Sequence, residues 1–302
     1  MATQLVSLPE VERLSASVVR ILAGNPSKIT ESNIFPGTNT YLIGRGPRRL
    51  LIDTGEGVPR WSSLLQTVLK DEKATVHEAL ITHWHHDHVN GIPDLLRICP
   101  QATVYKHQPD DGQREIEDGQ VFQVEGATLK AFHTPGHTVD HMSFIFEEED
   151  AIFTGDNVLG HGTAVFEDLH AYIDSLHKMK SAVSGRAYPG HGPVLDNATA
   201  KITDYIKHRQ QREDEVVRVL TYGTVDAAEA QKKSGEQQQQ QGSSSWTPIE
   251  LVKVIYRDVP ESLHLPASHG IVLILNKLEN EGKVKHEGSS GKWSLNVHRP
   301  AL

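Results

Sequence analysis

The segment Thr82-His83-Trp84-His85-His86-Asp87-His88 decides the fold of this chain. It ends an apolar run, Val76–Thr82, which predicts a buried strand. His83 and His85 alternate, so both side chains can point the same way, and the Asp87-His88 pair then enters a following helix. Imidazole nitrogens and carboxylate oxygens are both ligands that zinc accepts. The segment therefore predicts a metal site at a turn between a strand and a helix.

Three further candidate ligands follow, each beside a glycine at the predicted end of a strand. His137 lies in Thr134–Thr138 (TPGHT), Asp156 follows Gly155, and His191 lies in Tyr188–Gly192 (YPGHG). Pro-Gly and Gly allow sharp turns, so three strand ends can each present one side chain at the same edge of a sheet. A chance cluster of exposed histidines would not be expected to recur in this way. The predicted metal ligands are His83, His85, Asp87, His88, His137, Asp156 and His191.

In this order, the motifs HxHxDH, TPGH, GD and PGH resemble those of the metallo-β-lactamase superfamily, over about residues 15–215. The resemblance implies an α/β fold, a four-layer αβ/βα sandwich of two mixed sheets covered by helices. It also implies two Zn²⁺ ions, although Mn²⁺ or iron can occupy such sites. The implied division is His83, His85 and His137 on one ion, Asp87, His88 and His191 on the other, and Asp156 as a bridge.

The chemistry that such a pair of ions supports is hydrolysis. Two adjacent zinc ions lower the pKa of a shared water toward neutrality and polarise a carbonyl or phosphoryl oxygen. Asp87 is the expected catalytic residue, because its carboxylate can orient the water and pass a proton to the leaving group. Asp53, in Leu51–Gly55 (LIDTG), matches an early acidic motif of the family. We expect it to support the metal ligands without binding a metal itself, by fixing a histidine tautomer or the turn.

The remaining elements follow from local patterns. Short apolar or β-branched runs predict strands at Val18–Leu22, Thr40–Ile43, Leu50–Ile52, Val104, Val121–Val124, Ala127–Phe132, Ser143–Phe146 and Ala151–Phe153. Helical spacing predicts helices over Trp61–Lys70, His88–Ile98, Leu169–Ser181 and Asn197–Leu220. Pro100 is expected to end the second of these helices.

The chain is expected to have three parts. Residues 1–221 form the hydrolase domain, residues 222–245 a flexible low-complexity linker or insertion (SGEQQQQQGSSS), and residues 246–302 a small winged-helix-like module. The module should start at Thr247, an N-cap followed by Pro248 and closed as a capping box by Glu250. A helix over Glu250–Arg257, a second over Ser268–Glu281 that stops at Gly282, and a hairpin of Val284–His286 with Lys292–Leu295 complete it.

Finer features resemble two subfamilies. They are Gly37–Leu42, Asp53–Gly57, Asp118–Phe122, Val124–Leu129 and Thr154–Asp168. One subfamily is the fungal metallo-β-lactamase-type thioesterases of polyketide biosynthesis, such as atrochrysone carboxyl ACP thioesterases. The other is beta-lactamase-like protein 2, an endoribonuclease that cuts single-stranded RNA. The segment Lys106–Gln113 is closer to the thioesterases, whereas Glu31–Pro36 is longer than in either and is expected to reshape the pocket rim.

The resemblance therefore implies hydrolysis of a polyketide or aryl thioester on the acyl carrier protein of a non-reducing polyketide synthase. Three alternatives stay open at this point. They are the endoribonuclease, a glyoxalase II-like thioester hydrolase, and a metal-binding scaffold without catalysis. The basic stretch Lys207, His208, Arg209 and Arg212 could contact an acidic carrier, although a solvated helix face is the simpler interpretation.

Composition agrees with a globular enzyme. The 302 residues are 37% hydrophobic and 23% charged, with a net charge of -9 that argues against a nonspecific nucleic-acid binder. The module at 246–302 has seven Lys or Arg and six Asp or Glu, which favours a lid or docking surface over nucleic-acid binding. The sequence has no apolar run of membrane-spanning length and no secretory N-terminus, and the single Cys99 excludes an intramolecular disulfide. The expected location is the cytoplasm.

Overall fold

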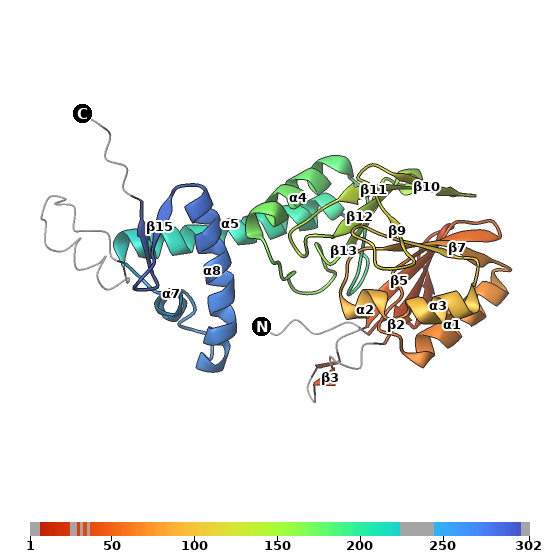
Figure 1. Ribbon diagram of the computed structural model, residues 1–302, viewed down its shortest axis with the longest axis horizontal. Coiled ribbons are helices and arrows are strands. Elements are labelled where there is room, and N and C mark those ends of the chain that lie inside the picture. The colour runs from red at the N-terminus through yellow and green to blue at the C-terminus, as the bar shows by residue number, and fades with distance from the viewer. Residues whose placement is uncertain (1–6, 25–28, 31–32, 35–36, 224–244, 297–302) are drawn as a thin grey trace, which may run out of the picture. The chain divides into compact units, whose positions relative to one another are not determined.

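The computed structural model describes residues 7–24, 29–30, 33–34, 37–223 and 245–296 (Figure 1). The chain divides into two compact units, Met1–Tyr205 and Ile206–Leu302. Most of the predicted linker at 222–245 lies outside the described residues, so the expected three-part division remains a prediction.

A mixed seven-stranded sheet forms the first half of the first unit. In spatial order its strands are β1 (Val11–Arg13), β2 (Val18–Ala23), β5 (Thr38–Ile43), β6 (Arg48–Ile52), β7 (Thr75–Ile81), β8 (Thr103–Lys106) and β9 (Arg114–Glu115). The strands from β1 to β6 pair antiparallel, and those from β6 to β9 pair parallel. The short strands β3 (Ile29–Thr30) and β4 (Asn33–Ile34) pair with each other outside this sheet.

A five-stranded sheet forms the second half. Its order is β10 (Val121–Val124), β11 (Ala127–His133), β12 (Met142–Phe146), β13 (Ala151–Gly155) and β14 (Ala187–Pro189). These strands pair antiparallel except for β13 and β14, which are parallel. The parallel pair matters for the site, because β13 and β14 bring their carboxyl ends to the same edge.

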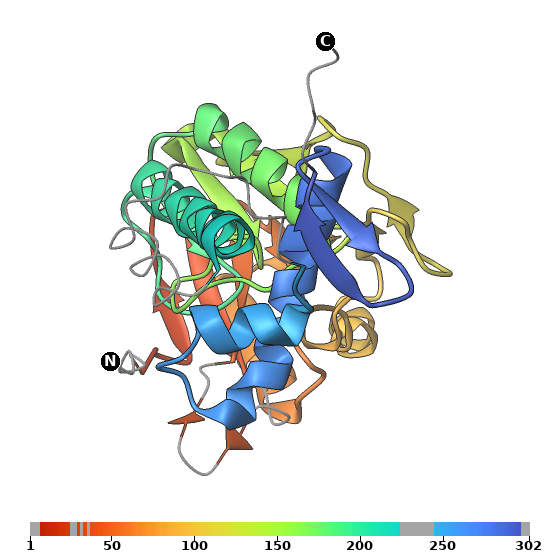
Figure 2. The same ribbon diagram turned by 90° about the vertical axis from the view of Figure 1, so that its left-hand side faces the viewer.

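The two sheets pack face to face around an aromatic core. Tyr41 of the first sheet lies edge-on to Phe153 of the second, with ring centroids 5.1 Å apart, and both side chains are buried. Helices α1 (Pro59–Asp71) and α3 (Ile92–Ile98) cover the outer face of the first sheet through Trp61, Leu65 and Leu95. Helix α4 (Leu169–Ala182) covers the second sheet, and α5 (Ala198–Tyr222) follows β14 (Figures 1 and 2). The predicted αβ/βα sandwich is confirmed.

One predicted helix is wrong. The span His88–Ile98 is not continuous but consists of α2 (His86–Val89) and α3, separated by Asn90 and Gly91. Pro93 lacks the backbone N–H that a continuous helix would need there. Gly91 also packs so closely that a Cβ would lie 2.0 Å from the carbonyl oxygen of Thr54. Because of this break, α2 ends at Val89, one residue after His88, the last residue of the histidine motif.

The second unit holds the small C-terminal fold. Helix α7 (Pro248–Ile255) starts with the predicted capping box between Thr247 and Glu250. A 3₁₀ turn, η3 (Glu261–Leu263), leads into α8 (His264–Asn280), and strands β15 (Val284–Glu287) and β16 (Lys292–Leu295) form an antiparallel hairpin. Within this unit Glu213 of α5 lies 2.6 Å from Lys277 of α8. Two helices followed by a hairpin are the elements that the sequence predicted for this module.

None of the described helices is both long enough and apolar enough to cross a membrane.

Candidate metal centre

All seven predicted ligands lie at one edge of the sandwich, in loops or on a short helix that follow strands. His83 and His85 follow β7, and Asp87 and His88 lie on α2. His137 follows β11, Asp156 follows β13, and His191 follows β14. The side chains form two groups in which the potential ligand atoms lie within 4.8 Å of one another. The first group is His83, His85, His137 and Asp156, and the second is Asp87, His88 and His191.

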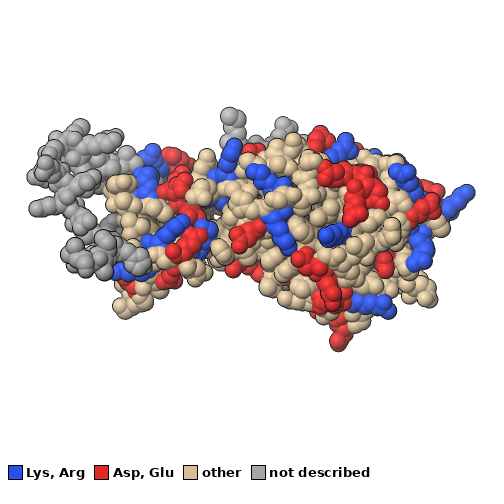
Figure 3. All heavy atoms as spheres, turned by 90° about the horizontal axis from the view of Figure 1, so that it is seen from above, with Lys and Arg blue, Asp and Glu red and all other residues tan. Residues whose placement is uncertain are grey.

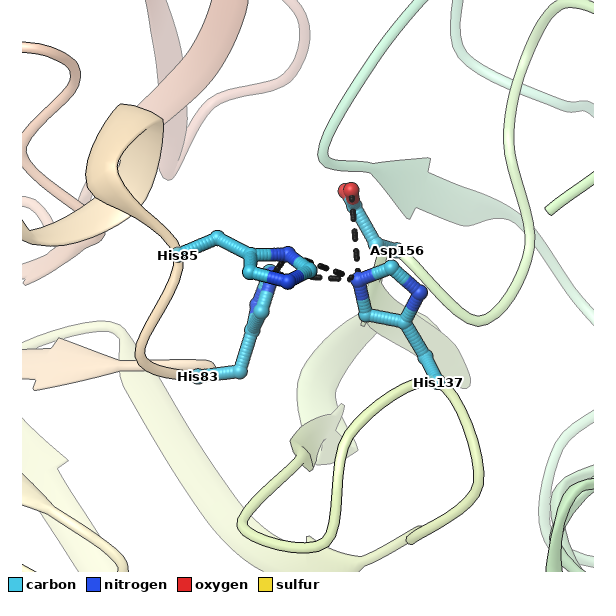
Figure 4. A group of neighbouring side chains, drawn as sticks. All are labelled: His83, His85, His137 and Asp156. Carbon is cyan, nitrogen blue, oxygen red and sulfur yellow. Dashed lines mark hydrogen bonds and ion pairs between the residues drawn. The ribbon is translucent and has the colours of Figure 1, made fainter. Parts of the chain in front are cut away.

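The first group is a tight triangle of imidazole nitrogens (Figure 4). His83 Nε2 lies 2.9 Å from His85 Nδ1, and His137 Nε2 lies 3.2 Å and 3.1 Å from these two atoms. Ligand nitrogens bound to one tetrahedral zinc at about 2.0–2.1 Å lie roughly 3.3 Å apart. The triangle thus has nearly the size that one metal ion requires.

The hydrogen bonds of these rings direct lone pairs into the triangle. His137 Nδ1 lies 2.8 Å from the carbonyl oxygen of Val165, which can only accept, so Nδ1 carries the proton. The Thr82 hydroxyl donates to Asp53 Oδ2 and lies 2.9 Å from His83 Nδ1, so His83 Nδ1 donates to that hydroxyl. The Nε2 atoms of His83 and His137 are therefore both unprotonated when the rings are neutral. These two atoms lie 3.2 Å apart, and a cation bound between them would remove the repulsion of their lone pairs.

The second group is looser and shares Asp156 with the first. Asp87 Oδ2 lies 3.3 Å from His191 Nε2 and 3.9 Å from His88 Nε2. Asp156 Oδ1 lies 3.5 Å from His88 Nε2, while Asp156 Oδ2 lies 3.3 Å from His191 Nε2 and 3.7 Å from His137 Nε2. Asp156 is therefore close to ligands of both groups, as a bridging carboxylate must be.

Electrostatics divides the two groups. Burial, together with neighbouring histidines, lowers the pKa of His83 well below its usual value and that of His85 to about 4. For His191, burial is outweighed by Asp156 and Asp87, which raise its pKa to about 10. The pKa of Asp156 lies well below its usual value, because His191 and His88 outweigh the effect of burial. His83 and His85 of the first group are therefore neutral donors, whereas His191 of the second group carries a proton between the carboxylates of Asp87 and Asp156.

Several buried atoms at this edge have no hydrogen-bond partner within the part of the chain that the structure describes. They include His88 Nε2, His191 Nε2 and Asp156 Oδ1. A buried polar atom without a partner costs free energy, so such atoms call for a bound ion or ligand. The donor set of imidazole nitrogen and carboxylate oxygen suits a divalent cation. The residues therefore fit a metal centre, and the assignment of each side chain as a ligand remains a proposal.

Asp53 lies where the sequence predicted a supporting residue. Its Oδ2 accepts from His88 Nδ1 at 2.8 Å, and its Oδ1 accepts from the backbone N–H of Thr82 at 2.8 Å. The side chain is buried. Its contacts thus fix both the tautomer of one candidate ligand and the turn that carries the others.

The sequence did not predict one buried supporting residue, His141. Its Nε2 accepts from the backbone N–H of Asp156 at 3.1 Å, and its Nδ1 lies 3.0 Å from the hydroxyl of Thr134. The only signal was its position in Thr134–His141 (TPGHTVDH), where a second histidine follows the first by four residues.

Of the predicted rim segment Glu31–Pro36, only residues 33–34 are described, so its effect on a pocket lies outside the described residues.

Family models match both parts of the chain. The metallo-beta-lactamase superfamily matches at residues 34–113 and 103–191, which include all seven candidate ligands. The beta-lactamase associated winged helix domain matches at residues 247–293. The second match agrees with the helices and hairpin described above.

Known proteins resemble the chain over nearly its whole length. An atrochrysone carboxyl ACP thioesterase of Aspergillus chevalieri is 44% identical over 97% of this chain and 91% of that protein. The lactamase-like protein ptaB of Pestalotiopsis fici is 42% identical over 95% of this chain and 88% of that protein. A beta-lactamase domain protein from Burkholderia ambifaria aligns with a TM-score of 0.75 at 15% identity, covering 96% of this chain and 95% of that one. The structural likeness concerns the fold alone.

Proposed function

This chain belongs to the metallo-β-lactamase superfamily and is a metal-dependent hydrolase, and we propose that its substrate is a polyketide thioester. The thioester is held on the acyl carrier protein of a non-reducing polyketide synthase, in secondary-metabolite biosynthesis. The observation that carries this proposal is the 44% identity, over 97% of the chain, to a protein named an ACP thioesterase. The cytoplasm stays the expected compartment.

We assign two Zn²⁺ ions to the centre. His83, His85 and His137 would hold one ion, Asp87, His88 and His191 the other, and Asp156 would contact both. When bound, such ions lower the pKa of a water toward neutrality and polarise the thioester carbonyl. The facing lone pairs of the first group and the unpartnered buried atoms of the second support this assignment.

The side chains of the protein itself supply orientation and proton transfer. Hydrolysis adds water across the C–S bond, so the acyl group leaves as a carboxylic acid and the carrier thiol gains a proton. Asp87 is only partly buried, and its Oδ2 faces His191 across 3.3 Å. We assign to Asp87 Oδ2 the transfer of the proton from the attacking water to the departing sulfur. Asp53 and Thr82 keep the histidine rings fixed during this step.

The alternative hydrolases draw less support. An endoribonuclease would be expected to present a basic surface to RNA. The net charge is -9, and acidic and basic side chains intermingle on the face drawn in Figure 3. A glyoxalase II-like enzyme would share the metal chemistry but not the carrier protein, whereas the relative from Aspergillus chevalieri is named an ACP thioesterase.

The proposal can be tested with three substrates. Purified protein should release the acyl product from a polyketide-loaded carrier protein, and should leave single-stranded RNA and a glutathione thioester uncleaved. Asp87→Ala and His83→Ala should abolish release while the circular dichroism spectrum is kept. His86→Ala is the matched control, because His86 lies in the same motif but is exposed and belongs to neither group. Cleavage of RNA without release of the acyl product would refute the proposal that the protein is a thioesterase.

A further inference from the structure

Thr38, at the amino-terminal end of β5, contacts two members of the second metal group, Asp87 and His191. The Thr38 hydroxyl donates to Asp87 Oδ2 at 3.1 Å. The backbone of Thr38 also pairs with that of His191 in an isolated antiparallel bridge. Thr38 is only 1% exposed, so its hydroxyl is buried with its acceptor close by. One residue thus contacts two candidate ligands that lie more than a hundred positions apart in the sequence.

The next residue holds the turn that carries His191. The backbone N–H of Asn39 donates to the carbonyl oxygen of Gly190 at 2.7 Å. Its side-chain amide donates to the carbonyl oxygens of Pro189 and Gly192 at 2.9 Å and 2.8 Å. β5 belongs to the first sheet and this turn ends β14 of the second, so the contacts join the two sheets at the ligand-bearing edge.

The ligands of the second group, like those of the first, come from both sheets, so contacts between the sheets fix their relative positions. Asp87 lies on α2, which follows β7 of the first sheet in the chain, and His191 follows β14 of the second. The Thr38 hydroxyl binds the same Asp87 oxygen that lies 3.3 Å from His191 Nε2. A hydrogen bond to that oxygen limits rotation of the carboxylate, and fixed ligands bind a metal more tightly than mobile ones.

The first group is supported by different residues. His83 is held through Thr82, and His137 is held by the carbonyl oxygen of Val165. Loss of the Thr38 hydroxyl would therefore leave the triangle of the first group intact. We propose that Thr38 is a positioning residue for the second metal group alone, and that its hydroxyl sets the affinity of Asp87, His88 and His191 for their ion. This inference rests on the proposed metal centre and not on the identity of the substrate.

The test is a zinc titration of the full chain, stripped of metal, against a chromophoric chelator. The wild-type protein should bind two equivalents. Thr38→Val, which replaces the hydroxyl by a methyl group, should bind one equivalent with unchanged affinity and the other about 10- to 100-fold more weakly. Thr38→Ser keeps the hydroxyl and should restore both affinities. Thr38→Ala is a second variant that lacks the hydroxyl, with the same expected result should the valine disturb folding.

Two backgrounds identify the affected ion. In His85→Ala, which damages the first group, Thr38→Val should still weaken the remaining equivalent about 10- to 100-fold. In His191→Ala, which damages the second group, Thr38→Val should have no further effect, because coupled residues are not additive. Thr40→Val is the matched control: Thr40 lies in the same strand, but its hydroxyl contacts Ile21 and Trp61 instead of a ligand. It should leave both affinities unchanged.

The outcomes separate this inference from the proposed function. If Thr38→Val binds both equivalents as the wild type does, or weakens both of them, the inference is wrong. The same holds if Thr40→Val causes an equal loss. A wild-type protein that binds no zinc would instead overturn the metal centre itself, and loss of thioesterase activity with intact zinc binding would concern only the substrate.

Discussion

Asp53 Oδ2 lies 2.8 Å from His88 Nδ1, and Asp53 reaches it from a left-handed backbone conformation with φ of 58°. A non-glycine residue is uncommon in this region, although Asp and Asn tolerate it better than most. The same carboxylate accepts hydrogen bonds from Thr82. The left-handed backbone of Asp53 thus places its carboxylate against His88 Nδ1, the ring nitrogen opposite the candidate ligand atom Nε2.

Replacement of Asp53 by Asn should disable the second metal group without unfolding the chain. Asn tolerates the left-handed backbone, but its amide has an NH₂ group in place of one carboxylate oxygen, so it cannot accept hydrogen bonds from both His88 Nδ1 and the backbone N–H of Thr82. Zinc affinity of one equivalent should fall about 10- to 100-fold. The measurement is a zinc titration, with Asp150→Asn as control, since Asp150 is also left-handed (φ 47°) but exposed and remote from the ligands. Equal affinities in the two variants would contradict the assigned role.

Zinc binding should release a proton from His191. Asp156 and Asp87, working against burial, raise the pKa of His191 to about 10, so the metal-free ring is protonated at pH 6. The pKa of His85 is lowered to about 4, so that ring is already neutral at pH 6 and has no proton to lose. Calorimetry in two buffers with different ionisation enthalpies should detect about one proton fewer in His191→Gln than in the wild type. His85→Ala should not lower the release. An unchanged count in His191→Gln would exclude His191 as the source.

The sequence was sufficient to predict the candidate ligands and most of the strands, because four candidates share one motif and His137, Asp156 and His191 each lie beside a local turn signal. Gly136, Gly155 and Gly190 mark the turns that follow β11, β13 and β14. The division of the ligands into two groups was implied only by family resemblance. Spacing alone could not have given it, since Asp156 lies close to both groups.

The features that the sequence did not reveal depend on contacts between distant elements. The hydrogen bond from Thr38 to Asp87 spans 49 positions and exists only because β5 begins beside α2. Pro93 indicates the break between α2 and α3, but the apolar periodicity of His88–Ile98 predicted one continuous helix. Strand β14 has only three residues, too few for a periodic pattern.

Two glycines of the second unit should respond to alanine in opposite directions. Gly270 lies inside α8 with open space around it, so Gly270→Ala should stabilise the helix by about 0.5–1 kcal/mol. Gly282 follows the same helix with φ of 71°, where alanine is strained, so Gly282→Ala should destabilise it by about 1 kcal/mol. Native-state hydrogen exchange of the α8 amides measures both changes. Shifts of the same sign would show that backbone conformation does not govern these positions.

Gly190 should be essential to the metal centre although it offers no ligand. A Cβ on this residue would lie 2.4 Å from Asp156 Oδ1 and 3.1 Å from His88 Cε1. Gly190→Ala must therefore displace the shared carboxylate, and we expect zinc affinity to fall about 10-fold or more and turnover to fall with it. Gly24→Ala is the control, because Gly24 belongs to the same unit and has nothing within 4 Å of the added carbon. Zinc titration, with circular dichroism to verify folding, decides the matter. Wild-type affinity in Gly190→Ala would mean that the displaced Asp156 is not needed to hold the ions, and its role as a bridge would then have to be abandoned.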